Sequence, residues 1–399
     1  MVKYKRIKLM SFDYFLNTKL LNKINKKLEN NIFKTPLFYS TKQKLTFNFV
    51  DKVSKDRFLS YYTKAFYDVF LESDVEKKLK IYELAFLVII ETKTNLDFLT
   101  ILKIFKEIKK GKRPTNYLER LVFNIIYAYE YIKKPKVLVN EDNLEMLISI
   151  LLVGLEFDLD LKINYYRTPK TKTITSNSLS SELISKELEN LFNYLNFLQV
   201  NNLCTYSQTF LLFSTLIMIS PFQKYNLIFI TLFSQWISFQ HNSSNKLIIP
   251  ISYFLKDLNN YLLEFNNLNN NFQADNLIDL LSNDYLKSIN MYNHASCVYK
   301  WIIKDKNRLW IFEDDASFIV LTLFLENSSN LSFNNIKSLL TINKIKLLNE
   351  EQIKNTLDKL VLNNVLKTTN DHVVKYVLVD KYLEKSKYLI NMKGLYNGL

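Results

Sequence analysis

Apolar residues recur at helical spacing along most of the chain. Over residues 74–90, for example, Tyr82, Ala85 and Val88 fall on one broad apolar face. Residues 163–178 interrupt this pattern, because β-branched residues, tyrosine and proline follow one another there. The pattern therefore predicts a helical core with a small β-flap. Further helices are predicted over residues 55–70, 95–109, 117–133, 143–155, 182–198, 251–268 and 276–303.

Residues 205–239 form the most apolar part of the chain, in two uncharged runs separated by residues 223–226. A helix that crosses a bilayer needs about 18 or more apolar residues in succession. Ser214 and Thr231 interrupt the runs, and Lys224 lies in the connection between them. The pattern favours two buried core helices joined by a short loop, and no membrane span is expected.

The C-terminal residues predict a winged-helix (α+β) module. Residues 316–325 form an apolar helix, and Ser332 caps a short second one. Asn349 and Gln352 have the spacing of a capping box at the start of a third helix, and two strand-like runs follow on either side of residues 370–371. Helix, short helix, helix and β-hairpin is the winged-helix order. The predicted division is an N-terminal helical region at 1–135, a helical core at 136–305 and the winged helix at 306–399.

The charge of the third C-terminal helix bears on whether such a module reads DNA. A recognition helix near phosphates is normally basic. This helix is slightly negative, which favours a protein contact, although Lys367 and Lys375 could still give the wing a basic face. Its charged residues are Glu350, Glu351, Lys354, Asp358 and Lys359.

Composition excludes several classes of function. The formal net charge of +14 favours anionic partners, but the lysines are dispersed, which is also typical of solvated surfaces. Two separate cysteines, Cys204 and Cys297, give neither a disulfide framework nor CxxC spacing, and three histidines make a histidine-based metal cluster improbable. The four glycines cannot build a phosphate-binding loop. Met1 to Met10 lacks a secretory signal, so a cytoplasmic location is expected.

Two segments in the middle of the chain carry a family resemblance. "YYRTPK" contains Tyr165, Tyr166 and Arg167, and "FSTLIMISPFQKYNLIFIT" spans Phe213 to Thr231. They resemble, in order, the YR element before the target-binding flap and the HPFx(D/E)GNGRxxR motif of the Fic/Doc (Fido) nucleotidyl transferases. Among the motif positions, the residues that match are Pro221, Phe222 and Asn226.

The departures from the motif fall on its chemistry. Ser220 stands at the position of the catalytic histidine, and a serine hydroxyl cannot act as a general base near neutral pH. Lys224 stands at the acidic, metal-binding position, where a cation repels Mg²⁺. The motif's glycines and arginines are replaced by Tyr225, Leu227, Ile228 and Thr231. The resemblance thus implies a degenerate adenylyltransferase fold with no catalytic residue, no metal and no cofactor, although Lys224 and Asn226 could still meet an ATP phosphate.

The preferred interpretation is a catalytically inactive Fic-like domain that binds a protein partner through its flap, by β-augmentation. Three alternatives stay open. Residues 330–340, "NLSFNNIKSLL", resemble the cullin-homology region, which implies a scaffold. A DNA-binding regulator would use the wing. A transferase with unusual chemistry would use a serine such as Ser207, Ser214 or Ser220, none of which has a histidine nearby in the sequence.

Overall fold

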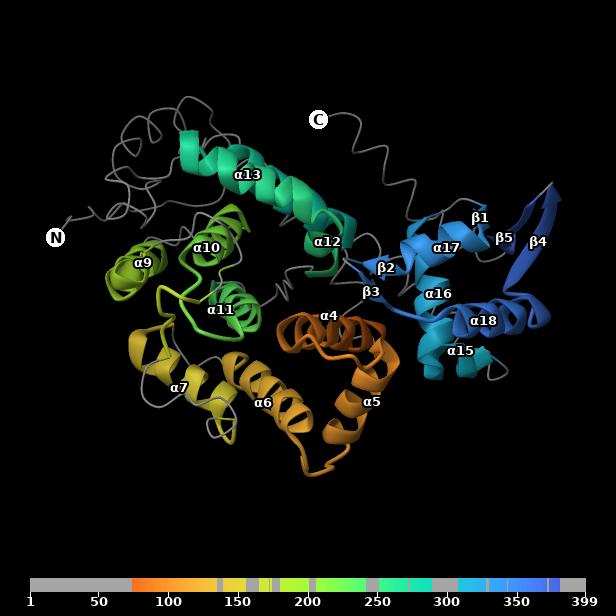
Figure 1. The fold of residues 1–399 in the computed structure, drawn as a ribbon, viewed down its shortest axis with the longest axis horizontal. Coiled ribbons are helices and arrows are strands. Elements are labelled where there is room, and N and C mark those ends of the chain that lie inside the picture. The colour runs from red at the N-terminus through yellow and green to blue at the C-terminus, as the bar shows by residue number, and fades with distance from the viewer. Residues whose placement is uncertain are drawn as a thin grey trace. The chain divides into compact units, whose positions relative to one another are not determined.

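The chain is mainly α-helical with short antiparallel strands, as the sequence predicts (Figure 1). Contacts divide it into two compact units, each assembled from separate segments of the chain. Among described residues, the helical unit contains 107–241 and 257–285, and the mixed unit contains 74–106, 251–256 and 286–380. The computed structural model describes residues 74–134, 139–155, 165–171, 173, 180–200, 206–241, 251–271, 273–288, 308–327, 330–342, 344–371 and 373–380.

The helical unit has a core of aromatic and aliphatic side chains. α10 packs against α11, and α6 packs against both α7 and α11. The described residues of α10 are buried, as are those of α11 up to Ile237, which confirms the prediction of two core helices. Trp236 and Phe213 are fully buried there. No described helix is both long and apolar enough to cross a bilayer. The helices are α6 (Tyr117–Ile132), α7 (Glu141–Leu152), α9 (Ile184–Val200), α10 (Tyr206–Ile219), α11 (Asn226–His241), α13 (Leu258–Asn271) and a further helix at residues 275–288.

The mixed unit combines two early helices with the C-terminal part of the chain. β5 lies between β1 and β4 in an antiparallel sheet, with Leu331 opposite Tyr376 and Leu366 opposite Leu378. β2 and β3 form a separate two-stranded ladder, and α18 packs against α16. The elements are α4 (Asp74–Thr92), α5 (Phe98–Lys109, whose last turn belongs to the helical unit), α12 (Ile251–Lys256), α15 (Leu309–Glu313), α16 (Asp315–Glu326), β1 (Leu331–Ser332), α17 (Phe333–Leu339), β2 (Thr341–Ile342), β3 (Ile345–Lys346), α18 (Glu350–Leu362), β4 (Leu366–Asp371) and β5 (Val373–Leu378).

Local signals at the helix starts of this unit are confirmed. The Asn349 side chain accepts a hydrogen bond from the backbone N–H of Gln352 at 2.8 Å, and the Gln352 side chain accepts from the Asn349 N–H at 2.8 Å. Ser332 accepts from the Asn335 N–H at 3.3 Å and so caps α17. The predicted hairpin is present as β4 and β5, but the turn is not at Asn370 and Asp371, because these residues belong to β4 and pair with Val374 and Val373. The short strands β1, β2 and β3 have no counterpart in the sequence prediction.

The prediction of one helix over residues 251–268 is wrong. The helix stops at Lys256 and a new one begins at Leu258, and the two pieces belong to different units. At the break, the Asp257 carbonyl accepts from the N–H groups of Asn260 and Tyr261 at 3.0 and 3.2 Å, which starts the second helix. Of the predicted flap, residues 165–171 and 173 are described, and the rest lies outside the described residues.

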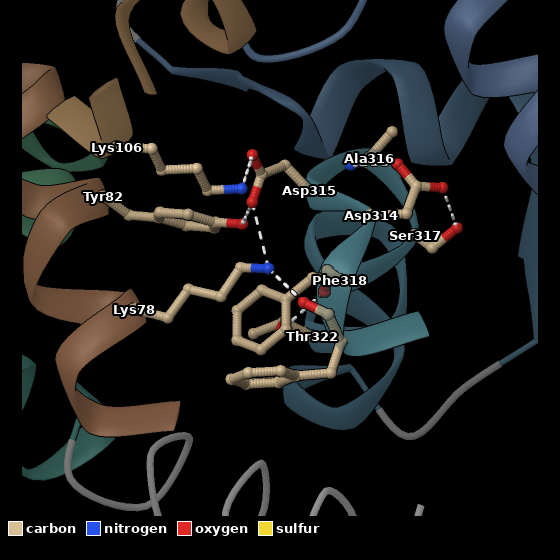
Figure 2. Close-up of polar contacts among 10 residues, drawn as sticks. Lys78, Tyr82, Lys106, Asp314, Asp315, Ala316, Ser317, Phe318 and Thr322 are labelled. Carbon is tan, nitrogen blue, oxygen red and sulfur yellow. Dashed lines mark hydrogen bonds and ion pairs between the residues drawn. The ribbon is translucent and has the colours of Figure 1, made fainter. Parts of the chain in front are cut away.

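Asp315 at the start of α16 is the centre of a polar cluster that joins α16 to α4 and α5 (Figure 2). Its carboxylate contacts Lys78 at 3.0 Å and Lys106 at 2.5 Å, and it accepts a hydrogen bond from the Tyr82 hydroxyl at 3.2 Å. Lys78 also donates to the Phe312 carbonyl. Burial lowers the pKa of Lys78, an effect that nearby Asp315 opposes. A buried ammonium is tolerated in this place because a carboxylate faces it.

Glu83 of α4 is fully buried and faces the start of α12. Its two oxygens accept hydrogen bonds from the Ser252 hydroxyl at 2.6 Å and from the Ser252 N–H at 2.9 Å. Burial raises the pKa of Glu83 to about 7, because the two hydrogen bonds only partly compensate for the lost hydration. The carboxylate therefore serves as a distant N-cap for α12 and is poised to titrate near neutral pH.

Candidate functional site

The loop between α10 and α11 contains the motif positions. Ser220 and Tyr225 have φ angles of 42° and 60°, in the left-handed region that non-glycine residues rarely adopt. Ser220 is buried and its hydroxyl donates to the Ile217 carbonyl at 2.6 Å. The hydroxyl is thus occupied in ending α10, and no described histidine or carboxylate contacts it to form a catalytic pair.

Asn226 closes this loop from within. Its side-chain oxygen accepts from the Phe222 N–H at 2.8 Å, and its side-chain nitrogen donates to the Phe222 carbonyl. Asn226 is buried, as are Pro221 and Phe222. The Asn226 amide therefore uses both its acceptor and its donor to hold the loop, and a phosphate would have to break these bonds to reach it.

The flap residues lie directly against the motif loop. Tyr166 forms an isolated antiparallel bridge with Phe222, flanked by two backbone hydrogen bonds: Arg167 N–H to the Pro221 carbonyl at 2.9 Å and Gln223 N–H to the Tyr165 carbonyl at 3.3 Å. The rings of Tyr166 and Phe222 are nearly parallel, with centroids 6.0 Å apart. Two segments that are separated in the sequence thus come together.

The Arg167 side chain anchors the flap to the end of α10. The guanidinium is buried; Nε donates to the Ser220 carbonyl at 2.8 Å, and Nη2 to the Ile219 carbonyl at 3.2 Å. Burial lowers its pKa. A cation is favourable at a helix C-terminus, where unpaired carbonyls carry partial negative charge. Arg167 consequently acts as a side-chain cap for α10.

Truncation of Arg167 to alanine is expected to destabilise the helical unit by about 2–3 kcal/mol, because buried carbonyls lose charged donors. Urea unfolding of the full chain measures this change. Arg113→Ala is the matched control, since Arg113 is exposed in the same unit. Arg167→Lys should also be destabilising, because an ammonium lacks the planar fork that meets two carbonyls. Equal stability of the Arg167→Ala and Arg113→Ala variants would show that the cap has no energetic role.

Lys224 is the exposed member of the loop and borders two hollows of different character. One is an apolar crevice against Tyr165, Phe222 and Tyr225, with a volume of about 20 Å³. Ligand pockets usually enclose roughly 300–1,000 Å³. The crevice is hence filled by the protein's own aromatic side chains and has room for about one water molecule.

The second hollow beside Lys224 is a polar cavity of about 750 Å³. Apart from Lys224, the residues that line this cavity lie outside the two segments that resemble the Fic motifs, so the resemblance does not point to it. Its sequence signals are weak: a rare glycine, Gly154, and a cap residue, Asn116, at the start of α6. Within the described residues, no three side chains of His, Cys, Asp or Glu gather as metal ligands. The residues that line the cavity are Pro114, Thr115, Asn116, Tyr117, Arg120, Gly154 and Lys224.

Comparison with known proteins finds similarity to solved structures. No protein-family model matches the sequence, and no curated protein matches it. A crystal structure of a Fic family protein from Desulfovibrio desulfuricans G20 is similar over 83% of this chain and 95% of its own, with a TM-score of 0.45 and 11% sequence identity.

Proposed function

We propose that this chain is a Fic-like protein without adenylyl-transfer activity, which binds a protein partner through its flap and ends in a winged-helix module. The observation that carries the proposal is the backbone bridge between Tyr166 and Phe222. It sets the flap against the motif loop, where a target-binding element would be required. Two polar side chains of the motif are already bonded, Ser220 to the end of α10 and Asn226 to the backbone of the loop.

The absence of catalysis follows from the chemistry of these residues. Transfer of a nucleotidyl group to a hydroxyl needs a general base and preorganised positive charge or metal around the phosphates. The Ser220 hydroxyl donates a hydrogen bond to the Ile217 carbonyl, and a serine hydroxyl does not act as a general base near neutral pH. Tyr225 and Leu227 are buried beside the loop and occupy the space that glycines would leave open.

Binding through the flap is supported by its geometry. The base of the flap is fixed by Arg167, which leaves a turn in which the Thr171 N–H donates to the Thr168 carbonyl at 3.0 Å. The residues of this turn, Thr168, Pro169 and Lys170, are exposed. A turn that is already ordered loses little conformational entropy when a partner binds it.

The experiment compares capture of protein partners by the wild-type chain and by a Thr168→Glu/Lys170→Glu variant. The variant should lose partners that the wild type retains, because the exposed turn changes charge while the Arg167 anchor is kept. Lys134→Glu is the control, since Lys134 is exposed at the far end of α6. Incubation with labelled ATP should transfer no label to any captured protein. Unchanged capture by the flap variant, or transfer of label, contradicts the proposal.

The charges of the mixed unit favour a protein contact over DNA for its winged-helix part. Lys359 of α18 pairs with Asp314 at 3.1 Å and lies 4.3 Å from the Trp310 ring centroid. Lys367 of β4 pairs with Asp380 at 3.1 Å. A lysine strengthens DNA binding when it neutralises a phosphate and releases the phosphate's counterion. A lysine that is already paired with a carboxylate must first give up that pair, so it contributes less. A DNA-reading wing is therefore the weaker candidate.

A further inference from the structure

We infer that the polar cavity bordered by α6, the end of α7 and the motif loop binds a small molecule that carries a phosphate group. This inference is independent of the flap and of any catalytic activity. It rests on four features of the helical unit: the size of the cavity, two cations in its wall, a glycine that makes room for one of them, and the neutralisation of the only carboxylate in the first turn of α6.

The size of the cavity fits a small organic ligand. The cavity is open to solvent, and its volume of about 750 Å³ is large enough to hold a small organic molecule, since ligand pockets usually enclose roughly 300–1,000 Å³. Its lining is polar, with the Thr115 and Asn116 side chains beside Arg120 and Lys224. An apolar ligand would find few contacts there, whereas a ligand with several oxygen atoms would find hydrogen-bond donors.

Arg120 and Lys224 give the wall two positive charges from different elements. Arg120 lies in α6, and Lys224 lies in the loop before α11. Across the described residues, neither is in an ion pair, and the contact found for Arg120 is with the face of Phe123, 5.6 Å from the ring centroid. A phosphomonoester carries a charge of about −1.5 to −2 at pH 7, which these two cations match. The planar guanidinium can bind two phosphate oxygens at once.

Gly154 makes room for the Arg120 side chain. A Cβ atom at Gly154 would lie 3.3 Å from Arg120 Nε and 3.4 Å from Arg120 Cδ, so the arginine crosses directly over the glycine backbone. Gly154 also has a φ of 73°, which disfavours other residues. A side chain at this position would press on the Arg120 side chain, so the glycine lets Arg120 lie close to the backbone there.

The neighbouring carboxylate does not cancel these charges. Glu119 precedes Arg120, but its carboxylate contacts Lys112 at 2.7 Å and accepts from the Thr115 N–H at 2.8 Å. The ion pair with Lys112 and the bonds from Thr115 lower the pKa of Glu119 to about 2, so it is ionised and already paired. Asn116 uses its side-chain oxygen to cap Glu119 N–H at 2.9 Å, which leaves the amide nitrogen of its side chain as a donor.

The test is calorimetric titration of the full chain with inorganic phosphate and with glycerol 3-phosphate, in a phosphate-free buffer of moderate ionic strength. Both should bind, and glycerol 3-phosphate should bind more tightly because the cavity exceeds the size of one phosphate. Arg120→Gln and Lys224→Gln should each weaken binding by about 10- to 100-fold, the loss expected for one charge-assisted hydrogen bond. Lys134→Gln, at the opposite end of α6, should bind as the wild type does.

Two results would overturn the inference. One is the absence of a binding heat for either probe at high millimolar concentration in the wild type. The other is equal affinity of the wild type and an Arg120→Gln/Lys224→Gln double variant, which would show that the phosphate binds elsewhere. Since Arg120 and Lys224 are not in the buried core, the variants should keep the wild-type unfolding curve, and this is checked for each of them.

Discussion

Replacing Asp315 with alanine is expected to destabilise the mixed unit by about 3–5 kcal/mol, the usual cost of removing one partner from a buried ion pair. The substitution removes the carboxylate that faces Lys78, and the Lys78 side chain is only 9% exposed. Lys78 would keep its hydrogen bond to the Phe312 carbonyl and its contacts with the rings of Phe312 and Phe318. Neutral groups of this kind cannot compensate for a lost counter-charge.

Urea unfolding of the full chain, followed by tryptophan fluorescence, measures this loss. Asp380→Ala is the matched control: it also removes a carboxylate from a lysine in the mixed unit, but Asp380 and Lys367 are 75% and 47% exposed. An exposed pair of this kind contributes about 0–1 kcal/mol. If Asp315→Ala costs no more than Asp380→Ala, the cluster does not stabilise the unit.

A paired substitution separates the charge effect from lost packing. In a Lys78→Met/Asp315→Leu variant both buried charges are absent, and buried ion pairs can often be replaced by apolar residues without net loss. We therefore expect this double variant to recover most of the stability that Asp315→Ala loses. If the double variant is no more stable than Asp315→Ala, the loss in Asp315→Ala arises from the packing of the cluster and not from its charge.

The second large effect is a dependence of stability on pH that arises from Glu83. Its pKa is about 7 in the folded chain and 4.5 in the unfolded one. At a pH below the lower value the group is protonated in both states. Between the two values only the unfolded chain releases its proton, so the free energy of unfolding falls as the pH rises. Above the folded pKa the loss is complete and amounts to about 3 kcal/mol.

Glu83→Gln should remove this dependence, because glutamine has the same shape and stays neutral. Its amide can accept from the Ser252 N–H and donate to the Ser252 hydroxyl, so α12 keeps its cap. Urea unfolding at a series of pH values from about 4.5 to about 8 tests the prediction. The wild type should lose about 3 kcal/mol relative to Glu83→Gln across this interval. Glu351→Gln, an exposed change on α18, should follow the wild type, and parallel curves for all three proteins would contradict the assignment.

What could be predicted from the sequence depends on how far apart the interacting residues lie. The start of α18 was predictable because Asn349 and Gln352 bond to each other's backbone within a single turn. The break between α12 and α13 was not, since the apolar pattern continues through it. The start of α12 is held by Glu83, which precedes Ser252 by 169 residues. No local pattern encodes a cap supplied from such a distance.

In the candidate site, too, contacts between residues that are far apart in the sequence could not be predicted. The bridge between Tyr166 and Phe222 was not predicted, because a single bridge leaves no alternation in the sequence. The buried position of Arg167 had no sequence signal, as its acceptors are backbone carbonyls, which every residue carries. The cavity beside Arg120 was also missed, since its wall is assembled from residues 114–120, Gly154 and Lys224, which lie far apart in the sequence.

The Asp315 cluster also has a consequence for how the chain matures during synthesis. Tyr82 and Asp315 are separated by 233 residues, so α4 leaves the ribosome long before α16 exists. At the usual elongation rates of about 5–20 residues per second, that interval lasts roughly 10–50 s. For most of it α4 lacks its contacts with α12, and for all of it Tyr82 lacks its ring contact with Phe318 of α16. We therefore expect the nascent chain to depend on chaperones that shield apolar helices, and codons that slow translation between these segments to lengthen this dependence.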